Sequence, residues 1–154
     1  MSLYQNVFKP FLFKFDAEAV HNVITFAGET VGDKIDFSYT NKKLHQKICG
    51  LDFANPMGLA AGFDYDGHLV TTMKSVGFGF NTVGTVTAKP YEGNKPPRLG
   101  RLPNSKALLV NKGFKSEGVD KVIKRLDQKK INSVVGISVG SSNLPEVNTV
   151  SKAI

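Results

Sequence analysis

Of the 154 residues of the chain, 41% are hydrophobic and 21% are charged, a composition that favours a globular protein over a disordered or fibrous one. The chain is too short for a complete eight-stranded β/α barrel, which needs about 250 residues. The net charge of the whole chain is +7, but residues 1–40 carry three Lys and five acidic residues, so the positive excess lies in the remainder. This basic remainder favours anionic ligands, while the spread of its Lys residues disfavours nucleic acid. The single cysteine, Cys49, excludes an internal disulfide and is expected to be buried, and the sequence shows neither a 20-residue apolar run nor a signal peptide.

Apolar residues recur at helical spacing twice within the first 32 residues. The first set is Tyr4, Phe8, Phe11, Leu12 and Phe15, and the second set is Val20, Val23, Ile24 and Ala27. Asp16 lies between the two sets as a predicted N-cap. Pro10 is expected to break or kink the first helix, and the glycines within residues 28–32 are expected to end the second.

Five of the eleven Phe residues fall within the first 26 positions, more than a pair of short helices can bury. Either these rings pack on the following domain, or they form a surface that faces lipid or a quinone. Because residues 1–40 are net negative, membrane contact would depend on apolar insertion rather than on attraction to anionic lipid.

Residues 33–47 form a polar connector, after which short apolar strands alternate with amphipathic helices. We predict a small hairpin over 48–53, strands over 55–61, 80–86 and 134–139, and helices over 69–76 and 119–126. Another helical pattern begins at residue 145. This alternation predicts parallel βα units and therefore the α/β class.

Small residues follow each predicted parallel strand, at 58–62, 84–85 and 140–142. Ligands bind at the C-terminal ends of such strands, and Gly or Ala there lets a flat cofactor approach the backbone. We therefore expect a cofactor or phosphate site where the three ends meet. The dinucleotide-binding and P-loop glycine motifs do not occur, and the three scattered His residues predict no metal site.

Residues 87–106 read as one long loop with four prolines and five cations, among them Arg98 and Arg101, against the single acid Glu92. The two arginines suit carboxylate or carbonyl oxygens, although surface solubility explains them equally well.

Several motifs occur in a specific order along most of the chain: 55–64 (NPMGLAAGFD), 77–80 (GFGF), 84–87 (GTVT), 89–90 with 93–94, 97–99 (PRL) and 101–103 (RLP). Together they resemble the quinone-linked, membrane-associated (class 2) dihydroorotate dehydrogenases. The resemblance implies an N-terminal helical extension followed by the first three βα units of an incomplete (β/α)8 TIM barrel. Residues 1–32 would be the membrane and quinone-tunnel extension, 33–47 the connector, and 48–154 the N-terminal part of an FMN-binding barrel.

The same resemblance implies an enzyme that oxidises dihydroorotate to orotate with FMN and passes the electrons to a quinone in pyrimidine biosynthesis. It would be a peripheral membrane protein on the cytoplasmic side, attached through the N-terminal helices. Its catalytic base is expected beyond Ile154, so the chain alone is expected to be inactive.

Site residues are implied by their positions in these motifs. The implied cofactor contacts are Ala61, Gly62, Phe63, Asp64 and Thr85, with Tyr65 and Ser138 included by position only. The implied substrate contacts are Asn111, Gly113 and Phe114, and the implied quinone-site residues are His21 and Arg101.

Three residues depart from the family pattern. Tyr65 stands where a Lys is usual, and Val110 and Ser138 stand where Asn is expected. Lys112 is a candidate to restore the lost positive charge from a neighbouring position. Two alternatives therefore stay open: a related FMN-dependent barrel oxidoreductase with another planar substrate, and a non-catalytic membrane-surface module.

Overall fold

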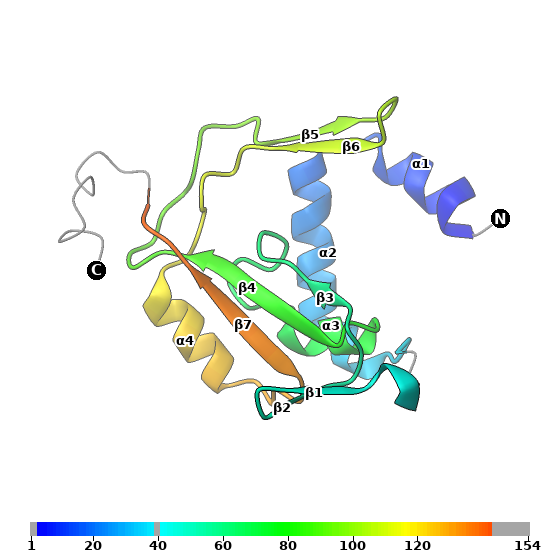
Figure 1. Ribbon diagram of the computed structural model, residues 1–154. Helices are drawn as coiled ribbons and strands as arrows, with labels where there is room; N and C mark the ends of the chain where they lie inside the picture. Colours follow the sequence, from blue (N-terminus) through cyan, green and yellow to red (C-terminus); the bar gives the residue numbers. More distant parts are fainter. Residues whose placement is uncertain (1–2, 39–40, 143–154) are drawn as a thin grey trace.

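The computed structural model of the chain describes residues 3–38 and 41–142, in which helices come first and strands then alternate with helices (Figure 1). The helical elements are η1 (Tyr4–Phe8, a π-helical turn), α1 (Lys9–Leu12), α2 (Ala17–Val31), the 3₁₀ turns η2 (Gly32–Lys34) and η3 (Lys42–Leu44), α3 (Val70–Ser75) and α4 (Val119–Asp127). The strands are β1 (Gln46–Ile48), β2 (Leu51–Phe53), β3 (Gly58–Leu59), β4 (Phe80–Val86), β5 (Leu99–Leu102), β6 (Ala107–Val110) and β7 (Val134–Val139). The helical pattern predicted from residue 145 lies outside the described residues.

A three-stranded parallel sheet in the order β3–β4–β7 forms the centre of the molecule. Its strands alternate with α3 and α4 along the chain, which confirms the predicted α/β class and the strand and helix predictions at 80–86, 119–126 and 134–139. The buried core lies between the sheet and these helices, and it consists of Val70, Val83, Val86 and Val122, with Leu126 and Val135 packed against them.

Two antiparallel hairpins accompany the sheet. The predicted hairpin near residue 50 is confirmed as β1–β2. Cys49 occupies its turn with a φ of 51° and is exposed, so the expectation of a buried cysteine is wrong. The prediction of one loop over residues 87–106 is also wrong, because Leu99–Leu102 pairs with Ala107–Val110 in the β5–β6 hairpin.

The N-terminal helices begin and end close to the predicted positions. The Asp16 carboxylate accepts a hydrogen bond from the Ala19 backbone N–H at 2.9 Å, which confirms the N-cap of α2. Pro10 lies in the first turn of α1, and the predicted first helix is divided just before it, where the chain changes from π-helical to α-helical geometry between Phe8 and Lys9.

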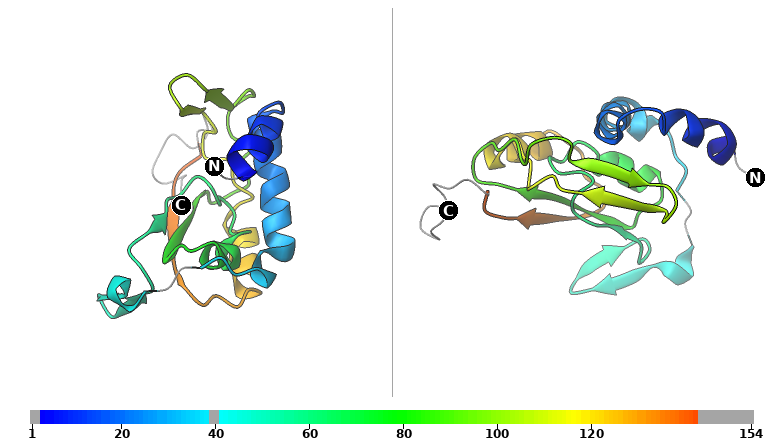
Figure 2. Two further views of the ribbon diagram at one scale, coloured as in Figure 1. Left: turned by 90° about the vertical axis from the view of Figure 1, so that its right-hand side faces the viewer. Right: turned by 90° about the horizontal axis from the view of Figure 1, so that it is seen from above.

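Helix α2 lies on the same side of the sheet as α3 and α4, whereas the β1–β2 hairpin projects on the opposite side (Figure 2). The Thr72 hydroxyl on α3 donates to the Gly28 carbonyl at 2.7 Å. A Cβ added at Gly32 would lie 2.7 Å from the Thr72 Cβ, so the absence of a side chain there permits the close approach. Gly28 is thus a helix-packing position within α2, and the predicted end of the helix within residues 28–32 is confirmed, since α2 ends at Val31 with Gly32 as its C-cap.

The Phe residues of the first helices stay largely exposed, including Phe11 and Phe26, the latter 72% exposed. They do not pack fully on the following residues, which disfavours the first of the two interpretations above. None of the described helices is long and apolar enough to cross a membrane.

Candidate functional site

The glycine-rich ends of the parallel strands meet, as the sequence predicts. The Gly62 N–H donates to the Gly84 carbonyl at 2.8 Å, so the segment after β3 is bound to the end of β4. At the neighbouring end of β7, the Ser138 hydroxyl lies 3.0 Å from the Thr85 hydroxyl. Three strand ends therefore share one edge of the sheet.

A hollow of about 340 Å³ opens at this edge, and we call it the glycine-lined pocket. Its lining residues come from the strand ends and from the segment between β6 and α4: Ala61, Gly62, Tyr65, Gly84, Thr85, Val110, Asn111, Lys112, Gly113, Phe114 and Lys115. Four of the expected cofactor positions and all three expected substrate positions are thus brought together. Gly62 has a φ of 101° and nothing within 4 Å of an added Cβ, which leaves its backbone open to a ligand.

The other expected cofactor residues face different partners. The buried Asp64 carboxylate accepts hydrogen bonds from the backbone N–H groups of His68, at 2.8 Å, and Leu69, at 2.9 Å, and so holds the turn that leads into α3. Burial raises the pKa of Asp64, and these two hydrogen bonds oppose that rise. Phe63 presents its carbonyl oxygen to the His21 ring at 2.8 Å.

Tyr65 connects the pocket to helix α2. Its hydroxyl oxygen lies 2.7 Å from the Lys112 Nζ and 3.3 Å from the His21 Nδ1, and its ring stacks on the imidazole at a centroid distance of 5.5 Å. Burial, assisted by the carboxylate of Glu18, raises the pKa of Tyr65 to about 12. Burial also lowers the pKa of Lys112, and burial together with the Lys112 charge lowers the pKa of His21.

An ion pair between Glu18 and Arg98 lies behind this group. The Arg98 Nε donates to one carboxylate oxygen at 3.0 Å and a terminal nitrogen to the other at 2.7 Å, and the side chains of Glu18 and Arg98 are only 14% and 11% exposed. The Lys112 Nζ lies 3.8 Å from the same carboxylate. Sequence reasoning missed this pair because its members are 80 positions apart, and the only local signal was the cationic segment that contains Arg98.

The two expected quinone-site residues have separate partners. Arg101 donates to the Phe15 carbonyl at 2.6 Å, and its guanidinium carbon lies 4.7 Å from the Phe13 ring centroid, at the junction of α1 and α2. His21 contacts Phe63 edge to face, at a centroid distance of 4.9 Å. Their role toward a quinone stays a prediction.

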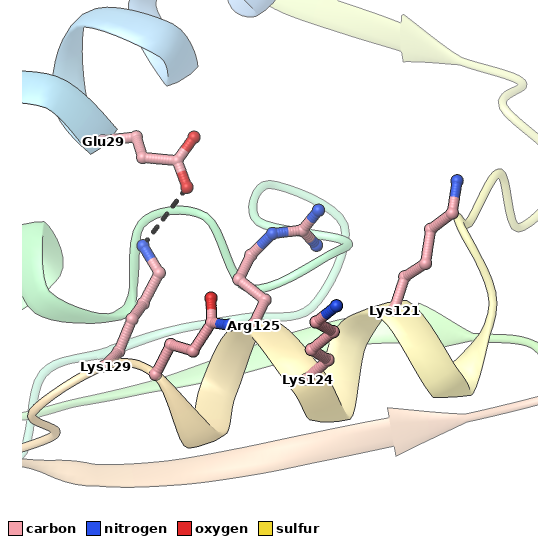
Figure 3. Close-up of a pocket in the computed structure, with 6 residues that line it drawn as sticks. Glu29, Lys121, Lys124, Arg125 and Lys129 are labelled. Carbon is pink, nitrogen blue, oxygen red and sulfur yellow. Dashed lines mark hydrogen bonds and ion pairs between the residues drawn. The ribbon is translucent and has the colours of Figure 1, made fainter.

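A second hollow, of about 310 Å³, is lined by side chains from α2 and α4 (Figure 3). Lys129, just after α4, lies 3.4 Å from Glu29 on α2, and Arg125 on α4 pairs with Glu117 in the segment before that helix. Both cations are therefore already engaged in ion pairs. Lys121 and Lys124 also line it. Among the described residues, no group of three or more His, Cys, Asp or Glu side chains is arranged to hold a metal ion.

A family model described as Dihydroorotate dehydrogenase matches residues 43–150, well over half of the chain. The chain belongs to this family. Among its curated relatives, the dihydroorotate dehydrogenase (quinone) of Christiangramia forsetii is 40% identical and that of Aeromonas salmonicida 39% identical. The matches cover 91% and 86% of this chain. The mitochondrial dihydroorotate dehydrogenase (quinone) of Cyclocybe aegerita is 37% identical over 91% of the chain. These names confirm the resemblance to the quinone-linked enzymes.

Solved structures give the same result. The crystal structure of DHODH in complex with ferulenol from Eimeria tenella superimposes with a TM-score of 0.70 at 34% identity, covering 81% of this chain and 36% of that one. The chain spans about two fifths of the length of the curated relatives it matches, 43% for Christiangramia forsetii and 40% for Aeromonas salmonicida.

Proposed function

We propose that the chain contributes the flavin- and substrate-binding part of a quinone-linked dihydroorotate dehydrogenase, an oxidoreductase that converts dihydroorotate to orotate with FMN in pyrimidine biosynthesis. The observation that carries the proposal is the glycine-lined pocket, where the ends of β3 and β4 face the segment between β6 and α4. Family membership and the similarity to a solved DHODH structure support it.

The residues of this pocket fit a flat ring system. The open backbone at Gly62, with no atom within 4 Å of an added Cβ, and the small side chains of Ala61 and Thr85 leave room for a planar group against the sheet edge. These residues would hold the flavin ring. When bound, FMN supplies the hydride acceptor of the reaction.

The pyrimidine would lie on the opposite wall, against Asn111, Gly113 and Phe114. The Asn111 side chain already accepts a hydrogen bond from the Asn94 amide at 2.8 Å, which holds its orientation. In this proposal residues 48–154 form the first three βα units of a (β/α)8 barrel, residues 33–47 are the connector, and residues 1–32 are the extension. The parallel β3–β4–β7 order supports the barrel assignment.

The extension is proposed to give a quinone access to the flavin and to rest on the cytoplasmic surface of a membrane. The exposed Phe8, Phe11 and Phe26 support an apolar contact. Because residues 1–40 are net negative, this contact depends on insertion of the rings and should persist at high salt.

Incubation of the full chain with FMN, followed by gel filtration and flavin absorbance, tests the proposal. Gly62 and Gly77 offer a matched pair of variants, because their φ angles are 101° and 103° and neither has an atom within 4 Å of an added Cβ. We expect G62V to abolish flavin retention and G77V, which carries the same backbone strain outside the pocket, to preserve it. A wild-type chain that retains no flavin overturns the assignment of the pocket to FMN.

Reduction of the bound flavin separates the two enzyme alternatives. We expect dihydroorotate to reduce it in the complete enzyme faster than other dihydropyrimidines or pyridine nucleotides. The reverse order would favour a related flavin oxidoreductase, the alternative raised by Tyr65, Val110 and Ser138.

A further inference from the structure

The hydrogen bonds around Tyr65 have one direction when the His21 imidazole is neutral. A carbonyl oxygen only accepts, so the His21 Nε2 that lies 2.8 Å from the Phe63 carbonyl oxygen must carry the hydrogen. In a neutral imidazole the other nitrogen, Nδ1, then accepts. The lowered pKa of His21 supports the neutral form. The Tyr65 hydroxyl is the group that donates to Nδ1, at 3.3 Å.

This direction leaves the Tyr65 oxygen as an acceptor for Lys112. The Lys112 Nζ donates to it at 2.7 Å and also lies 4.2 Å from the centroid of the Tyr65 ring, so the ammonium group is held by both the oxygen and the π-face. The only hydrogen of the Tyr65 hydroxyl is committed to His21. Tyr65 therefore has no hydrogen to offer a ligand in the glycine-lined pocket.

Lys112 retains both charge and donors for such a ligand. Both oxygens of Glu18 are taken by Arg98, at 3.0 Å and 2.7 Å, whereas the Lys112 Nζ is 3.8 Å from that carboxylate. The negative charge of Glu18 is thus neutralised mainly by Arg98 rather than by Lys112. An ammonium group has three N–H donors, and Tyr65 uses one of them. The Lys112 side chain is only 10% exposed and it lines the pocket.

We propose that Lys112 is the specificity-determining residue that recognises the carboxylate of a planar pyrimidine ligand in the glycine-lined pocket, and that Tyr65 is the positioning residue that holds Lys112 there. This inference rests on the proposed function, since that function supplies the class of ligand. It assigns the positive charge of the site to the segment between β6 and α4. Tyr65, on the segment after β3, then anchors this charge to helix α2 through His21.

Isothermal titration of the full chain with orotate and with uracil tests the assignment, because the two pyrimidines differ by the carboxylate. We expect orotate to bind at least about tenfold more tightly, the effect of one hydrogen bond to a charged group. K112M should abolish this ratio, and K112R should retain most of it. The exposed Lys130 provides the control variant K130M, which should leave the ratio unchanged.

The role of Tyr65 in positioning Lys112 can be tested by a separate measurement of ligand affinity. Y65F should lower orotate affinity several-fold and leave uracil affinity unchanged, whereas a merely structural defect would weaken both ligands. A wild-type chain without preference for orotate, or a preference that survives K112M, overturns the proposal.

The direction of the hydrogen bonds can be tested without any ligand. Nitrogen-15 NMR of the full chain should show His21 as the neutral Nε2–H tautomer at pH 7, and the Nδ1–H tautomer would refute the chain of donors. Flavin retention is measured separately. If the chain binds flavin but shows no preference for orotate that depends on Lys112, only this inference about Lys112 is overturned. If it shows that preference but binds no flavin, only the assignment of FMN to the pocket is overturned.

Discussion

Replacement of Glu18 by Gln tests whether the ion pair behind the pocket stabilises the fold. Each Glu18 oxygen accepts from Arg98, at 3.0 Å and 2.7 Å, in surroundings that leave the Glu18 side chain 14% exposed. The E18Q amide keeps one oxygen acceptor but loses the second acceptor and the charge. Because a hydrogen bond to a charged group contributes about 1.5–3 kcal/mol, we expect the free energy of unfolding to fall by about 2 kcal/mol.

Urea denaturation followed by far-UV circular dichroism measures this loss. For a small domain with a slope of about 2 kcal/mol per molar urea, the midpoint should fall by about 1 M. The matched control is E92Q. Glu92 is 94% exposed and its carboxylate lies 3.5 Å from the Lys115 Nζ, so this solvated pair should contribute little. If the midpoints of E18Q and E92Q coincide, the Glu18–Arg98 pair adds nothing to stability and the reasoning fails.

Three further substitutions address the core, the turn before α3 and the exposed rings. V122A removes two methyl groups from the buried core and should lower the free energy of unfolding in urea by about 2 kcal/mol. I123A, on the exposed side of the same helix, should lower it clearly less, and equal losses would contradict the core assignment. D64A deprives two backbone N–H groups in the turn before α3 of their acceptor and should lower the unfolding free energy by about 1–3 kcal/mol, and an unchanged midpoint would show that water replaces the carboxylate. F26D should reduce flotation of the chain with phosphatidylcholine liposomes, and N22D, which adds the same charge without removing a ring, should not; equal flotation of the two variants would argue against insertion at Phe26.

The central sheet could be predicted from the sequence because its signals are local. The strand over 80–86 and the helix that begins at Val119 follow from runs and periodicities of apolar residues, and the structure reproduces them within one residue. The meeting of the glycine-rich ends also followed from a general rule, since parallel strands place their C-terminal ends at one edge.

The missed features have different physical causes, and only one of them is a partner distant in the chain. The strand Leu99–Leu102 stands in a segment rich in proline and cations, and only its pairing with Ala107–Val110 defines it. The Asp64 carboxylate accepts hydrogen bonds from residues only four and five positions further on, but residue type alone does not distinguish this turn from a contact in the pocket. The exposure of Cys49 follows from a turn with positive φ, which residue type alone does not indicate.

The attachment of α2 has a mechanical consequence. The helix is fastened at Glu18 and His21 on the pocket side and at Gly28 and Gly32 on α3, two places separated by about ten residues or roughly 15 Å along its axis. A single set of contacts would fix the position of the helix, whereas two sets also fix the direction of its axis. A pivot of about 5° around the α3 end would displace the other end by about 1.3 Å over this length, enough to break the contacts of His21. Any contact that tilts α2 from its outward side would therefore also shift the residues that line the pocket.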